Sequence, residues 1–156
     1  MLFEYIRARL TNYIEQESGL NTKFNDYVDR QIRNSYDIEH VWAEDYTQDN
    51  HQYEFSTEEE FQNFRNSFGG LLLLPKDKNR SFQAMNYHHK LIKYDSENLL
   101  ARSLNPNCYK NNPSFLRFIS SNHLSFKSHN TFDKSDMEEY KHVSRKIWDI
   151  SLLSQF

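Results

Sequence analysis

Residues 37–41 have the sequence Asp-Ile-Glu-His-Val, and residues 69–80 have the sequence Gly-Gly-Leu-Leu-Leu-Leu-Pro-Lys-Asp-Lys-Asn-Arg. The first stretch is short and alternating as far as Trp42, which predicts a β-strand that ends in an acid–histidine pair. In the second stretch, the glycines break the chain, and four leucines before Pro75 are too few for a helix, so they predict a second, buried strand. Asn79 follows at the start of a predicted helix. The two stretches therefore predict a hairpin followed by a helix.

The rest of the chain predicts further helices. Apolar residues recur at three- and four-residue steps from residue 2 to residue 17, and capping boxes begin at Ser56 and Ser135. The long segment 43–55 and the polar segment 121–134 are predicted to be irregular. The helices are expected at residues 2–17, 24–32, 78–94, 96–104, 114–120 and 136–150, and a further short helix is expected after Ser56, with Phe61 and Phe64 in it. The prediction is an α+β fold in which helices dominate.

Composition sets broad limits on the class of protein. A chain of 156 residues fits one domain with one core. We expect a helical lead-in over 1–36, a core over 37–94 and a helical part over 95–156. No apolar run is long enough to cross a membrane, and no signal-peptide pattern is present. Cys108 is the single cysteine, which excludes an internal disulfide and agrees with a reducing cytoplasm.

Charge is distributed unevenly along the chain. Residues 1–70 contain 6 basic and 14 acidic side chains, whereas residues 71–130 contain 9 basic and 3 acidic ones. A basic segment can bind a polyanion even when the net charge of the chain is −3. The simpler interpretation, a solvated surface, stays open.

The side chains of the predicted hairpin suit phosphodiester hydrolysis. His40 can take a proton from water as a general base. Glu39 and Asn79 offer the oxygen ligands that Mg²⁺ or Mn²⁺ prefers. Because neighbouring residues of a strand point to opposite faces, Glu39 and His40 meet at one site only if the strand bends at its end.

Several basic side chains are candidates for contacts with phosphate. Arg80 and Lys90 are expected on or near the helix that contains Asn79, where Arg80 can bind phosphate through two donors. The same basic segment includes Lys76, Lys78 and Lys93. Gln83 would share the helix face of Asn79 but is a poor ligand, and His88 and His89 are expected on the surface.

These motifs resemble the His-Me finger, or HNH, nucleases, and most closely the C-terminal nuclease domain of GmrSD-type modification-dependent restriction endonucleases. The similar stretch extends from about Phe3 to Trp148. It includes the helix Phe3–Leu10, Tyr87–Tyr94, which is similar to a Phe-x-x-Lys-x-x-x-Tyr pattern, and Asn98–Leu104. Asp77–Arg80 is also similar to the corresponding segment of the HNH domain in RNA-guided CRISPR nucleases.

The resemblance implies a ββα-metal hairpin with a long loop, with His40 as general base and with Glu39 and Asn79 as ligands of one Mg²⁺ or Mn²⁺. It implies a DNA endonuclease of bacterial restriction or anti-phage defence, acting in the cytoplasm and coupled to a ParB-like sensing domain absent from this chain. In one respect the chain differs: Gly70 stands where the family usually has an asparagine that braces the loop. A metal-dependent RNase, or a nucleic-acid-binding or structural module with weakened catalysis, is the alternative.

Overall fold

The computed structural model describes residues 2–155. Helices surround a two-stranded antiparallel sheet, so the predicted helix-dominant α+β class is confirmed. The sheet consists of β1 (Tyr36–His40) and β2 (Leu71–Pro75). The α-helices are α1 (Leu2–Glu17), α2 (Phe24–Val28), α3 (Glu58–Arg65), α4 (Lys76–Phe82), α5 (Tyr87–Tyr94), α6 (Leu99–Arg102), α7 (Pro113–Ser121) and α8 (Lys134–Leu153), and the 3-10 helices are η1 (Gln48–Tyr53), η2 (Phe68–Gly70) and η3 (Pro106–Tyr109).

The hairpin forms where the sequence predicts it. Glu39 lies opposite Leu72, and His40 lies opposite Leu71. The four leucines of β2 are all buried, which explains why this strand has no apolar–polar alternation. α4 follows β2 directly and packs against both strands. The segment between the strands, residues 41–70, contains η1, α3 and η2.

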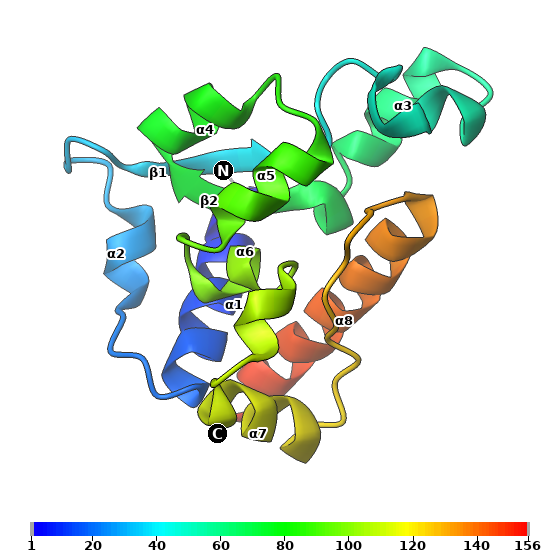
Figure 1. The fold of residues 1–156 in the computed structure, drawn as a ribbon. Helices are drawn as coiled ribbons and strands as arrows, with labels where there is room; N and C mark the ends of the chain where they lie inside the picture. Colours follow the sequence, from blue (N-terminus) through cyan, green and yellow to red (C-terminus); the bar gives the residue numbers. More distant parts are fainter. Residues whose placement is uncertain (1, 156) are drawn as a thin grey trace.

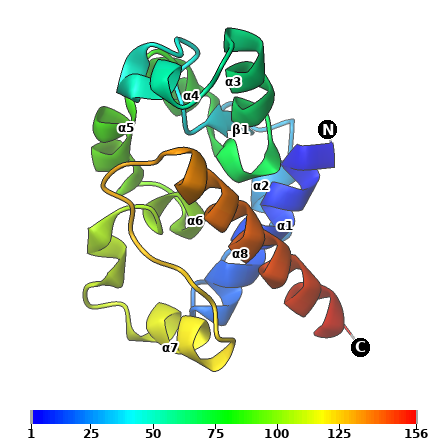
Figure 2. The ribbon, with the colours of Figure 1, turned by 90° about the vertical axis from the view of Figure 1, so that its right-hand side faces the viewer.

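Helices from the two ends of the chain support this hairpin. α1 packs against β2, α6, α7 and α8, and α8 also packs against η2, the turn that leads into β2 (Figures 1 and 2). The hairpin and α4 lie at one end of the molecule and α7 at the other in both views. Trp42 is fully buried, and its ring stacks on that of Phe61 with the ring centroids 5.5 Å apart. This contact fixes the start of the long segment 41–70 in the core. Within residues 2–155, no helix is long and apolar enough to cross a membrane.

Element boundaries differ from the prediction in the region after β2. The single helix expected over 78–94 is two helices, α4 and α5, separated at residues 83–86. α5 begins directly after Asn86, because the Asn86 side chain accepts a hydrogen bond from the backbone N–H of His89 and caps the helix. Asp77 lies inside α4, where its carboxylate accepts a hydrogen bond from the Asn34 side chain.

Other predicted helices are present with shifted or shorter limits. The helix expected over 24–32 ends at Val28, and the one expected over 96–104 is the short α6. The cap of α3 is Thr57 rather than Ser56, and the cap of α8 is Asp133 rather than Ser135. In each case a neighbouring side chain with the same capping chemistry forms the hydrogen bond.

Candidate active site

A pocket of about 260 Å³ opens beside the end of β1. Glu39, His40 and Asn79, the three residues predicted as the catalytic set, all line it. The strand provides the first two residues, and α4 provides the third. The other lining residues are Ile38, Glu44, Arg65, Arg80, Gln83 and Lys90.

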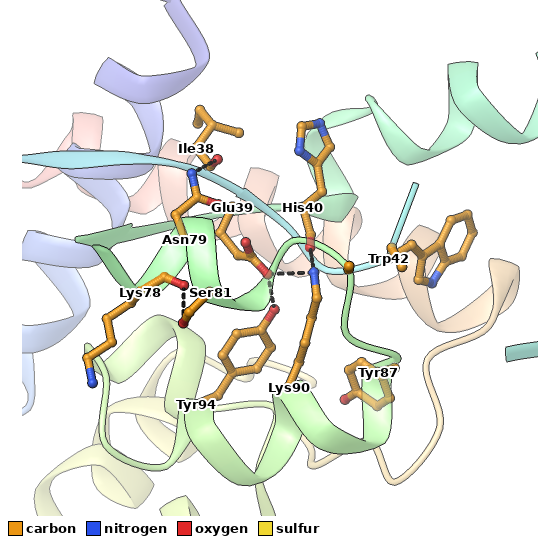
Figure 3. A network of polar contacts seen from close by, with 12 residues as sticks. Ile38, Glu39, His40, Trp42, Lys78, Asn79, Ser81, Tyr87, Lys90 and Tyr94 are labelled. Atoms are coloured by element: carbon orange, nitrogen blue, oxygen red, sulfur yellow. Dashed lines mark hydrogen bonds and ion pairs between the residues drawn. The ribbon is translucent and has the colours of Figure 1, made fainter. Parts of the chain in front are cut away.

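Glu39 is a buried carboxylate held by two donors. Its side chain is 1% exposed, and Oε1 accepts hydrogen bonds from Lys90 Nζ at 2.7 Å and from the Tyr94 hydroxyl at 2.9 Å (Figure 3). Burial raises the pKa of Glu39, and the positive charge of Lys90 opposes that rise. Within the described chain, no hydrogen bond engages Oε2. The carboxylate is therefore fixed through one oxygen and has the other available at the pocket.

Lys90 has a different environment from the one expected. Its side chain is 0% exposed, and Nζ donates to Glu39 Oε1 and to the main-chain carbonyl of His40, the latter at 2.5 Å. Lys90 was expected to contact phosphate, but its amine is instead buried against the Glu39 carboxylate, which needs a cation beside it. Lys78, Arg80 and Lys93 are exposed, as a phosphate contact requires.

His40 points to the side of the strand opposite Glu39, as expected for adjacent strand residues (Figure 3). Its Nε2 lies 2.8 Å from Asn66 Oδ1. The Asn66 amide nitrogen donates to the carbonyl of Gln62, so its oxygen faces the imidazole. Because that oxygen can only accept, Nε2 carries the proton and Nδ1 keeps its lone pair. Burial, followed by the charge of Arg65, lowers the pKa of His40 to about 4 and keeps the ring neutral.

Asn79 joins α4 to β1. Its amide nitrogen donates to the main-chain carbonyl of Ile38 at 2.9 Å (Figure 3). That hydrogen bond identifies which amide atom is nitrogen and leaves Oδ1 without a hydrogen-bond donor in the described chain. A carboxylate oxygen of Glu39 and this amide oxygen belong to residues that line the same pocket. Hard oxygen ligands of this kind fit Mg²⁺ or Mn²⁺ and do not favour zinc.

Gly70 lies where a side chain does not fit. A Cβ atom at this position would lie 2.8 Å from the carbonyl oxygen of Arg65 and 2.8 Å from the Met137 side chain. The asparagine that the resemblance places here therefore has no room. Another asparagine, Asn66 at the end of α3, contacts His40.

Sequence reasoning missed Arg65, Asn66 and Tyr94. Tyr94 could have been found from the four-residue spacing to Lys90, which puts both side chains on one face of a helix. Arg65 and Asn66 have no such signal, because their place at the pocket depends on how α3 folds back against the end of β1.

A second group of possible ligands lies apart from this pocket, at the start of α8. One potential ligand atom from each of His129, Asp136 and Glu139 lies within 4.8 Å of the other two. Each side chain already has a partner: His129 pairs with Asp136 at 3.1 Å, and Glu139 pairs with Lys127 at 2.9 Å. Asp136 also belongs to the capping box of α8. These contacts explain the group as structural.

Comparison with known families agrees with this arrangement. A family model described as the C-terminal domain of GmrSD restriction endonucleases matches residues 2–143. The chain belongs to this family. Searches of curated proteins and of solved structures find no match. Membership supports a nuclease domain that hydrolyses phosphodiester bonds, and the matched residues include the whole pocket.

Proposed function

We propose that this GmrSD-family domain is a divalent-metal-dependent DNA endonuclease, cutting or nicking, whose hairpin and α4 form a His-Me finger. The observation that supports the proposal most directly is a neutral histidine of defined tautomer beside two available oxygens. His40 keeps Nδ1 free, and Glu39 and Asn79 each have one side-chain oxygen without a donor in the described residues.

In the proposed reaction, His40 Nδ1 removes a proton from the attacking water. The water oxygen bonds to phosphorus, and the bond from phosphorus to the departing oxygen of the strand breaks. Asn66 accepts the hydrogen bond from Nε2 and stabilises the imidazolium that forms. Glu39 Oε2 and Asn79 Oδ1 would hold Mg²⁺ or Mn²⁺, which supplies positive charge for the phosphate and the departing oxygen.

DNA is the proposed substrate because the matched family consists of restriction endonucleases. Arg80, Lys78 and Lys93 are exposed on α4 and α5, where they can contact the phosphate backbone. Such contacts carry little sequence information, so we propose that target recognition depends on a separate, ParB-like sensing domain. We also propose that the domain acts in the bacterial cytoplasm.

The proposal is tested with supercoiled plasmid incubated in Mg²⁺, Mn²⁺ or EDTA. Wild type should convert the plasmid to open-circular or linear forms with either metal and leave it intact in EDTA. His40→Ala should slow cleavage by roughly 100- to 10,000-fold, the usual contribution of a general base. Asn79→Ala should raise the metal concentration that half-maximal cleavage requires. His89→Ala, an exposed histidine on α5, is the matched control and should cleave normally.

Cleavage by His40→Ala at the wild-type rate would contradict the assignment of the base. A structured RNA in a parallel reaction separates DNA from RNA hydrolysis. Preferential cleavage of the RNA would replace the proposed DNA endonuclease by an RNase with the same chemistry.

A further inference from the structure

Arg65 occupies a fixed position at the wall of the candidate active site. It is the last residue of α3 and its side chain is 8% exposed. Its Nε donates to the main-chain carbonyls of Trp42 and Ala43, at 3.1 Å each. Trp42 is fully buried, so these carbonyls belong to a rigid part of the core. The guanidinium is therefore held in place before any ligand arrives.

The terminal nitrogens of this guanidinium are not engaged within the described residues. No carboxylate in the described part of the chain forms an ion pair with Arg65, and none of its terminal nitrogens takes part in a hydrogen bond. Arg7 provides the contrast: it is also buried, but it donates to Ser144 and to the Phe68 carbonyl, and it lies over the Phe68 ring. Burial lowers the pKa of Arg65, and the charges of Glu44 and Glu39 oppose that shift without forming an ion pair with it. Arg65 thus lines the pocket with terminal nitrogens that no hydrogen bond engages in the described residues.

We propose that Arg65 binds a non-bridging oxygen of the phosphodiester group that the pocket takes up. This inference rests on the proposed nuclease function and identifies a substrate contact at the same site. Only Nε of the guanidinium is engaged, so its terminal nitrogens can bind phosphate through two parallel hydrogen bonds. Arg80 also lines the pocket, but it is exposed and must be ordered when substrate binds, whereas Arg65 is already ordered.

The contact is tested by NMR on protein labelled at its arginine side chains, without metal, so that no cleavage occurs. The probes are inorganic phosphate and a short DNA duplex, and Arg65→Lys identifies the Arg65 signals. We expect the Arg65 side-chain signals to shift with both probes. Signals of Arg117, exposed on the distant α7, should stay unchanged. Shifts with phosphate but none with the duplex, or no Arg65 shift with either probe, would overturn the inference.

Activity provides the second measurement. In single-turnover cleavage, Arg65→Gln should be about 100- to 1,000-fold slower than wild type, as for loss of a donor to a transition-state oxygen. Arg65→Lys keeps the charge but not the planar set of donors, so its cleavage rate should lie between those of Arg65→Gln and wild type. Wild-type rates in both variants would overturn the inference while leaving the proposed function intact. If wild type cleaves no nucleic acid but the Arg65 signals shift with phosphate and duplex, the nuclease function fails and the phosphate contact stands.

Discussion

At the scale of single residues, Lys90 is best understood as the internal partner of Glu39. Both side chains are almost fully buried, and both Lys90 and Tyr94 bind the same carboxylate oxygen. This arrangement keeps a carboxylate inside the fold and leaves Oε2 without a donor in the described residues, as the proposed metal site requires. Lys90 therefore acts on the site by positioning Glu39.

Removing the charge of Lys90 should destabilise the fold. Lys90→Met leaves Glu39 buried without a cation, and loss of one partner of a buried pair costs about 3–5 kcal/mol. The free energy of unfolding, measured in urea, should fall by that order in Lys90→Met. Lys93→Met, three residues along the same helix but exposed, should change it by less than about 0.5 kcal/mol. Equal stability of the two variants would contradict the internal role of Lys90.

Asn66 should matter for catalysis more than for stability. Asn66→Ala removes the acceptor that fixes the tautomer of His40. Because Asn66 is exposed, the substitution should disturb little packing. We expect a loss of cleavage rate of about tenfold or more, in line with the effect of partners that orient a reacting histidine. The rate and the urea midpoint are measured together. Asn63→Ala, exposed on the same helix, is the control, and an unchanged rate in Asn66→Ala would refute the role.

Site residues were predictable where a recognisable motif contains them. The spacing of Glu39, His40 and Asn79 was enough to select three residues that line one pocket. The burial of Lys90 was not predictable, because a lysine in an amphipathic helix gives no sign of a buried partner 51 residues earlier. Arg65 was missed for the same physical reason, since its contacts are with main-chain carbonyls that have no sequence signature.

At the scale of elements, the hairpin and the limits of α1 were predicted, whereas the break between α4 and α5 was not. Four consecutive leucines between Gly70 and Pro75 restrict the possible structures to a short buried strand. The break between α4 and α5 depends on the Asn86 cap, and many asparagines in this chain could cap a helix equally well. The domain limits 1–36, 37–94 and 95–156 stay predictions.

The turn into β2 should not accept side chains. A Cβ atom at Gly69 would collide with the Met137 carbonyl of α8, and one at Gly70 would lie 2.8 Å from the Arg65 carbonyl. Gly69→Ala and Gly70→Ala should each lower the free energy of unfolding by roughly 1–3 kcal/mol, because backbone must move. Gly70→Asn, which introduces the residue that the resemblance places here, should be at least as destabilising as Gly70→Ala. Thermal unfolding measures all three, and a gain in stability from Gly70→Asn would contradict the steric account.

At the scale of the whole molecule, the uneven charge along the sequence leads to exposed cations on α4 and α5, beside the pocket. Each lysine that contacts a phosphate adds about 0.9 to the slope of log binding constant against log salt concentration. Lys78→Ala and Lys93→Ala should each flatten that slope without changing sequence preference. Fluorescence anisotropy with duplexes of different sequence, in several KCl concentrations, measures both quantities. Lys110→Ala, outside these helices, is the control. A salt slope in Lys78→Ala and Lys93→Ala equal to that of wild type would indicate another binding face.

The packing of α8 against Gly69 and Gly70 has a consequence for the timing of activity during synthesis. The turn that introduces β2, and therefore positions α4, is covered by Met137 and Lys141. Ribosomes produce the chain from its N-terminus, so all the pocket residues, from Ile38 to Lys90, leave the ribosome before this cover exists. The hairpin reaches this support only when α8 docks, so we expect nuclease activity to appear only after α8 has been synthesised.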